Sequence, residues 1–101
     1  MADLRKLARG QQCTVRLPGG CNGNPETTVL AHFRMAGVSG MGIKSPDLLA
    51  AFACSACHDA IDRRAHMDLD RDYVRLAHLE GVVRTQAELL KRGVIKIGRA
   101  A

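Results

Sequence analysis

Aromatic residues are scarce in this chain of 101 residues, which has no tryptophan, one tyrosine and two phenylalanines. Few large side chains are therefore available to fill an interior, and a domain of this size buries only a modest core. Small domains with thin cores often depend on a metal ion or a disulfide for stability. The composition predicts a single domain spanning residues 1–101 that needs such an extra constraint.

Long hydrophobic segments are also absent from the sequence. The N-terminal residues MADLRKLARG contain no apolar stretch of the kind found in signal peptides, and no run approaches the length of a membrane-spanning helix. We therefore expect a cytoplasmic protein with no membrane partner. Because the cytoplasm keeps thiols reduced, the four cysteines favour metal binding over disulfide formation.

Acidic residues are too few to balance the basic ones: 10 Asp and Glu stand against 15 Lys and Arg, which gives a formal net charge of +5. Most of the basic residues are arginines, whose planar guanidinium groups suit bidentate phosphate contacts. Basic domains of this size commonly bind nucleic acid. We expect DNA to be held through its backbone by residues such as Arg16, Arg34, Arg63 and Arg64, without sequence readout.

The order of apolar and turn residues predicts a helix, a turn-rich segment and a strand in the first half of the chain. A short helix over ADLRKLAR ends at Gly10, and breakers such as PGG at 18–20 mark the turns. The segment Thr27–Met35 is apolar and β-branched enough for a strand. The apolar LLAAFA at 48–53 is ambiguous between strand and helix.

Two helices are predicted in the second half. The first opens at Cys54 and continues to roughly Arg64. The second is long and amphipathic, beginning near Asp68 and terminated by Gly93. Its apolar residues include Val74, Ala77, Val82, Leu89 and Leu90, and they can serve either the core or a dimer interface.

The cysteines form two pairs, Cys13-x7-Cys21 and Cys54-x2-Cys57, separated by a long intervening segment. A C-x2-C turn places two sulfurs about one tetrahedral edge apart, and a second pair completes a zinc shell. The PGG turn shortens the first, longer spacing. The pattern predicts a structural zinc ion bound by all four cysteines. Buried, metal-free cysteines are the alternative, whereas a thioredoxin-like dithiol lacks the βαβ context it requires.

Histidines and an acid follow the second cysteine pair at helical spacing. His58, Asp62 and His66 project on roughly one helical face, and His32 on the predicted strand can face them across a cleft. Such a set can hold a divalent cation beside a histidine that activates water. A solvated helix face is the alternative, and for His66 it is preferred. His78, on the long helix, is interpreted as a surface or packing residue.

The strings C-x7-CNGNPET, LAH and ACSACHD-x-IDRR together resemble the YbcO-like family of small phage and prophage nucleases, over nearly the whole chain. That family is similar in turn to HNH, or ββα-metal, endonucleases. The resemblance implies a small α+β domain of treble-clef type, with a zinc knuckle, a short β-hairpin and a long C-terminal helix. It also implies that Cys13, Cys21, Cys54 and Cys57 bind zinc, that His32 is the general base, and that His58 is a metal ligand or site residue.

Two positions depart from the HNH pattern. Ala31 stands where an acid or histidine often precedes the base, and no asparagine lies between His32 and Cys54. Asp47, or Asn22 or Asn24 from the knuckle, would have to replace the asparagine that orients the base.

The sequence therefore predicts a metal-dependent endonuclease that hydrolyses DNA phosphodiester bonds in phage or prophage recombination or DNA processing. Its catalytic residues would be His32, His58 and Asp62, with Mg, Mn or Ni as a second divalent cation. The alternatives are a non-catalytic zinc module that binds DNA or assists recombination, and a purely structural zinc protein. A homodimer or phage recombination proteins are further candidate partners.

Overall fold

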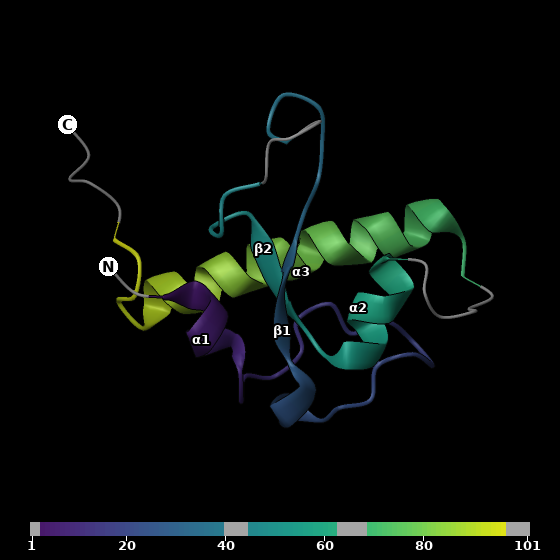
Figure 1. Cartoon of the computed structure of the whole chain (residues 1–101), viewed down its shortest axis with the longest axis horizontal. Helices are drawn as coiled ribbons and strands as arrows, with labels where there is room; N and C mark the ends of the chain where they lie inside the picture. Colours follow the sequence, from purple (N-terminus) through teal and green to yellow (C-terminus); the bar gives the residue numbers. More distant parts are fainter. Residues whose placement is uncertain (1–2, 40–44, 63–68, 97–101) are drawn as a thin grey trace.

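The computed structural model describes residues 3–39, 45–62 and 69–96 of the chain. Two strands and three α-helices make up most of the regular structure, with one turn of 3₁₀ helix (Figure 1). In chain order the elements are α1 (Leu4–Ala8), η1 (Pro25–Thr27), β1 (Val29–His32), β2 (Ala50–Ala53), α2 (Ser55–Ile61) and α3 (Arg71–Lys91).

The strands β1 and β2 form an antiparallel hairpin at the centre of the molecule. Val29 pairs with Ala53 and His32 pairs with Ala50. Successive side chains of a strand point to opposite faces, so each strand contributes to two separate hydrophobic clusters. Leu30 and Phe52 pack with α1 on one face, while the alternate residues pack with the cysteines and α3 on the other.

The long helix α3 crosses the molecule behind the hairpin, with α1 near one of its ends and α2 near the other (Figure 1). The helix packs closely at Gly81, where an added Cβ would lie 3.0 Å from Val15 Cγ2 and 3.2 Å from Ala51 Cβ. A side chain at this position would push the helix away from β2, so Gly81 permits the close packing.

Hydroxyl groups join α3, β2 and the segment that carries Cys13. The Phe52 N–H donates to Thr85 Oγ1 at 3.1 Å, and the Thr14 hydroxyl donates to the Phe52 carbonyl at 3.0 Å. The two hydroxyl oxygens lie 2.8 Å apart. Because the Thr14 proton is already used, Thr85 donates to Thr14, and the three residues form a closed ring of buried hydrogen bonds.

The predicted fold class is confirmed: the chain is a small α+β protein with a two-stranded hairpin and a long C-terminal helix. The segment that was ambiguous between strand and helix is strand β2, and the predicted strand Thr27–Met35 is shorter, ending at His32. Gly93 does terminate α3, with a positive φ of 74°.

The apolar residues predicted on α3 are not all part of the core. Leu90 is 40% exposed, whereas its neighbour Leu89 is buried. Only the side of the helix facing β2 is covered, and Leu90 points away from it. None of the helices in the described residues has both the length and the hydropathy that a segment crossing a bilayer requires.

Candidate functional site

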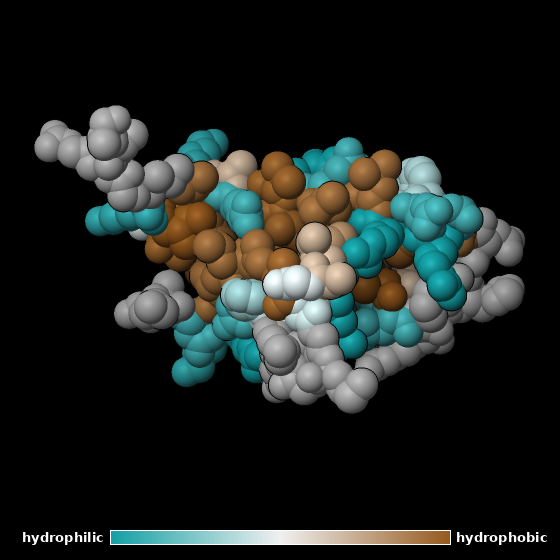
Figure 2. Space-filling model, turned by 90° about the horizontal axis from the view of Figure 1, so that it is seen from above, coloured by the Kyte–Doolittle hydropathy of each residue, from teal (hydrophilic) through white to brown (hydrophobic). Residues whose placement is uncertain are grey.

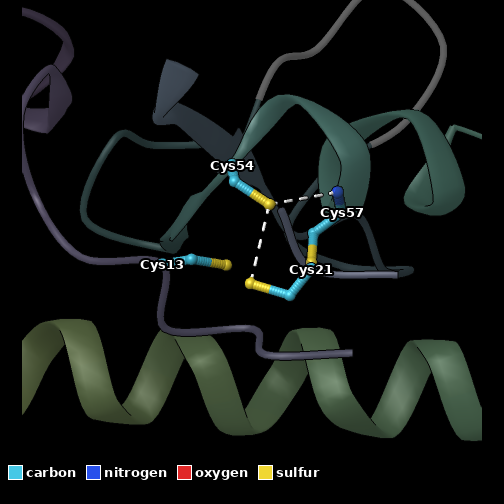
Figure 3. A group of neighbouring side chains, drawn as sticks. All are labelled: Cys13, Cys21, Cys54 and Cys57. Atoms are coloured by element: carbon cyan, nitrogen blue, oxygen red, sulfur yellow. Dashed lines mark hydrogen bonds between the residues drawn. The ribbon is translucent and has the colours of Figure 1, made fainter. Parts of the chain in front are cut away.

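Four cysteines from distant parts of the chain converge beside the hairpin (Figure 3). Cys13 and Cys21 flank the turn at Leu17, whose carbonyl accepts the N–H of Cys21 at 3.0 Å. Cys54 is the N-cap of α2, and Cys57 lies in its first turn. All four Sγ atoms lie within 4.8 Å of one another.

The sulfur arrangement fits a metal ion. Tetrahedral zinc with bonds of about 2.3 Å requires sulfurs about 3.8 Å apart, and Cys21 Sγ and Cys54 Sγ are separated by 3.8 Å. Backbone N–H groups of Asn22 and Cys57 each donate to Cys54 Sγ at 3.4 Å. The cluster can therefore hold a metal ion, in agreement with the predicted zinc site.

Thiols of the cluster perturb one another's ionisation. A hydrogen bond from Cys57 lowers the pKa of Cys13 to about 4, and the same contact raises the pKa of Cys57. Burial raises the pKa of Cys21. Four neighbouring thiols cannot all ionise without a compensating positive charge, which a bound cation supplies.

A second group of polar residues surrounds the end of β1. His32 Nε2 lies 2.7 Å from Asp47 Oδ1, and Arg5 Nε lies 3.6 Å from the same oxygen. The hydrogen bond with His32 lowers the pKa of Asp47. Three residues were candidates for orienting His32, and Asp47 is the one that contacts it. Asn22 instead bonds Thr27 and Ser55, and Asn24 caps η1.

The other predicted catalytic residues lie on α2 and at its C-terminal cap. His58 Nε2 and Asp62 Oδ2 are 3.5 Å apart, one helical turn from each other. A histidine nitrogen and a carboxylate oxygen thus lie next to each other at this end of α2. His66, Arg63 and Arg64 lie outside the described residues.

His32 and Asp62 face one cleft of about 500 Å³. Its remaining described walls are Arg34, Ile61, Arg75 and His78. The predicted histidine on the strand and the predicted acid of α2 are thus brought together across an open space. His58 is not one of the described walls of this cleft, but it contacts Asp62, which is.

Sequence reasoning missed the contribution of α3 to this cleft. The Arg75 guanidinium lies 4.5 Å above the Phe33 ring and donates to the Arg34 carbonyl at 3.0 Å. His78 is buried, with its Nε2 2.9 Å from the Ala31 carbonyl, so the packing interpretation applies. The spacing of Arg71, Arg75 and His78, four and three residues apart on one side of the helix, is the signal that could have indicated this polar side.

The fold and the site define a small α+β protein whose four cysteines, beside a β-hairpin and a short helix, lie close enough together to hold a metal ion. Comparison with known families gives the particular group. A family model described as "Putative nuclease YbcO" matches residues 2–94. The chain belongs to this YbcO family, which confirms the resemblance seen in the sequence.

Individual relatives agree with the family assignment. "Putative nuclease YbcO" of Escherichia coli (strain K12) and "Putative nuclease ybcO" of Enterobacteria phage 82 are each 62% identical over 96 residues, covering 95% of this chain and 99% of the relative. A solved structure, of a "putative bacteriophage protein from Escherichia coli str. K-12 substr. MG1655", has 57% identity and a TM-score of 0.76. It covers 90% of this chain and 100% of its own.

Proposed function

We propose that the whole chain acts as one HNH-like domain of treble-clef type that hydrolyses DNA phosphodiester bonds with the help of a divalent cation. The observation that carries the proposal is His32, which contacts Asp47 and lines a cleft together with Asp62 and two arginines. The name of the family supports the same reaction class. The phage relative is consistent with a role in phage or prophage recombination or DNA processing.

His32 is the proposed general base. If Nε2–H donates to the Asp47 carboxylate, the neutral ring presents a lone pair on Nδ1. That nitrogen takes a proton from water, and the resulting hydroxide attacks the phosphorus in line with the departing oxygen. Asp47 holds the ring orientation and stabilises the imidazolium that forms, the role usually filled by a separate orienting residue.

His58 and Asp62 are the proposed ligands of a catalytic cation such as Mg, Mn or Ni. Their nitrogen and oxygen atoms, 3.5 Å apart, suit divalent ions of this group. When bound, the cation stabilises negative charge on the pentacovalent phosphate and on the leaving oxygen. The zinc ion proposed at the four cysteines has a different task, because it is held by a closed set of ligands and fixes the start of α2.

The arginines of the cleft are the proposed contacts to the DNA backbone. Arg34 and Arg75 both line it, and Arg75 is held in place by Phe33 and the Arg34 carbonyl. A guanidinium that is already ordered loses little entropy on binding a phosphate. Of the predicted contacts, Arg16 lies instead beside Val15 and Pro18 at the other side of α3.

The test is His32→Ala, assayed by plasmid nicking with Mg²⁺, Mn²⁺ or Ni²⁺. Loss of a general base should reduce cleavage by on the order of 10²–10⁴-fold while zinc content, melting temperature and DNA affinity stay at wild-type levels. His78→Ala is the matched control, since it removes a buried packing histidine and should lower the melting temperature. Cleavage by His32→Ala at the wild-type rate would contradict the proposed role.

A non-catalytic zinc module that binds DNA is the second candidate. The observation in its favour is Ala31, which is 1% exposed and packed in the core next to the proposed base, where HNH sites often carry a polar residue. A wild-type protein that nicks nothing with any of the three ions, yet binds DNA with an affinity that falls steeply with salt, would decide for this candidate. A protein that neither nicks DNA nor binds it would be a purely structural zinc domain.

A further inference from the structure

The side of α3 that faces away from the hairpin carries a row of exposed apolar side chains. Leu76, Leu79, Val83 and Leu90 are 56%, 43%, 59% and 40% exposed. Their spacing of three, four and seven residues places them on one line along the helix, which we call the α3 stripe. Figure 2, seen from above, shows apolar residues in a row along the long axis of the molecule, the direction in which α3 runs.

The stripe lies opposite the face that α3 buries against its own chain. The buried residues of the helix include Val74, Val82 and Leu89, on the side of β2 and the two clusters. A single exposed leucine is ordinary in a soluble protein, but a helix that is apolar along two opposite sides is typical of one that packs between two partners. One partner of α3 is the hairpin, and the stripe on the opposite side is left exposed.

Charges beside the stripe differ between its two halves. Asp72 and Glu80 flank the first half, whereas Arg84 and Lys91 flank the second. One N–H group of the Arg84 guanidinium donates to the Thr14 carbonyl at 2.8 Å, and this guanidinium forms no ion pair with an acid among the residues that the structure describes. Within the described part of the chain, the carboxylates of Asp72 and Glu80 and the Lys91 ammonium have no ion pair.

The arginines of the first half are directed elsewhere. Arg71 and Arg75 line the hollow beside His78, and Arg75 contacts Phe33. The stripe is therefore bordered by unpaired acids at one end and by bases at the other. This is the arrangement that a self-complementary antiparallel contact requires.

We propose that a second copy of this chain covers the α3 stripe, with the two α3 helices packed antiparallel about a two-fold axis near Gly81. In this register Asp72 of one copy lies opposite Lys91 of the other, and Glu80 lies near Arg84. Each pairing occurs twice, because the axis exchanges the copies. A parallel pairing would instead bring like charges together.

Surfaces on both sides of the stripe would add to the contact between the two α3 helices. A hollow of about 150 Å³ lies between the Val15–Pro18 turn and the side of α3 at Tyr73 and Leu76, where a side chain of the second copy can enter. On the other side, Gln86 Nε2 donates to the carbonyl of Leu48, which is itself 42% exposed. From Leu76 to Leu90 the stripe is about 21 Å long, which suits a small interface and a micromolar dimer.

Sedimentation velocity across a range of protein concentrations tests the proposal, with Val83→Glu as the disrupting variant. Val29→Glu is the matched control: it makes the same change at an exposed valine, but on β1. We expect wild type and Val29→Glu to dimerise with similar affinity and Val83→Glu to remain monomeric. Melting temperature and zinc content, measured alongside, should show that Val83→Glu is folded.

A photo-crosslinking amino acid at Leu76 tests the orientation. Antiparallel packing predicts crosslinks to the end of α3 near Ala87 and Leu90 of the second copy. Crosslinks from one Leu76 position to the other would contradict it. A wild type that stays monomeric up to hundreds of micromolar, or a dimer that persists in Val83→Glu, would overturn the proposal.

Discussion

Two histidines at the same cleft differ in their surroundings, and this difference decides which is the better base. His32 is partly exposed and has the Asp47 carboxylate 2.7 Å from its Nε2. His78 is 4% exposed, meets Phe33 edge to face, and has a pKa lowered by burial. A carboxylate partner stabilises the imidazolium that a base becomes, whereas burial opposes it. His32 is therefore suited to accept a proton and His78 to pack.

Arg75 offers a test of the cleft at the scale of one residue. Arg75→Met should weaken DNA binding and reduce the slope of log affinity against log salt by about one, because one phosphate contact is lost. Arg75→Lys should keep part of the affinity, since charge remains while the planar fork is lost. Titrations at several salt concentrations measure both effects.

Arg9→Met is the control for Arg75, because it removes the same charge from an exposed position after α1. Equal losses of affinity in Arg75→Met and Arg9→Met would show that the cleft has no special part in binding.

At the scale of the elements, the molecule depends on where α3 meets β2. The buried ring of hydrogen bonds through Thr14, Phe52 and Thr85 joins the helix, the strand and the segment that carries Cys13. Gly81 lets the same helix approach Val15 and Ala51 closely. These contacts position the cysteine cluster and one wall of the cleft together.

Thr85→Val tests this contact between α3 and β2. Valine has nearly the same shape but leaves the Phe52 N–H without its acceptor, so we expect a loss of about 1–3 kcal/mol in the free energy of unfolding. Thr85→Ser keeps the hydroxyl and loses one methyl group, worth about 0.8 kcal/mol. Urea denaturation compares the two. If serine costs as much as valine, the hydrogen bonds contribute little.

At the scale of the whole molecule, metal binding and folding should be one process. Cys57→Ser is expected to lose both bound zinc and the cooperative melting transition, since binding energy at such sites is folding energy. Metal analysis and calorimetry measure the two losses. The wild type treated with a chelator should behave like the variant and recover when zinc is returned; an unchanged melting transition without metal would contradict this.

Acid should have the same effect as the chelator. The proposed zinc ion binds the cysteines as thiolates, so protons compete with the metal for the sulfurs. Lowering the pH therefore favours the protonated, metal-free chain. Stability from the site is thus present at neutral pH and lost as the pH falls. Readdition of zinc at low pH should restore less than it does at neutral pH.

Some features could be predicted because their signals are local. Cys54 and Cys57 lie in one helical turn, and Asp62 follows His58 by another, so their proximity is a property of the α-helix itself. The family resemblance likewise depends on continuous strings around the cysteines. The short strand β2 was ambiguous for the same reason: its four buried residues have no alternation that distinguishes strand from helix.

The sequence by itself determined the cysteine cluster, the family, the α+β class and the positions of His32, His58 and Asp62. Only the tertiary structure selected Asp47 as the partner of His32, brought Arg75 into the cleft and left the α3 stripe exposed. These three outcomes depend on contacts between segments far apart in the chain. Helical and strand periodicity identify a side of an element, but the packing of other elements decides whether that side faces protein, substrate or solvent.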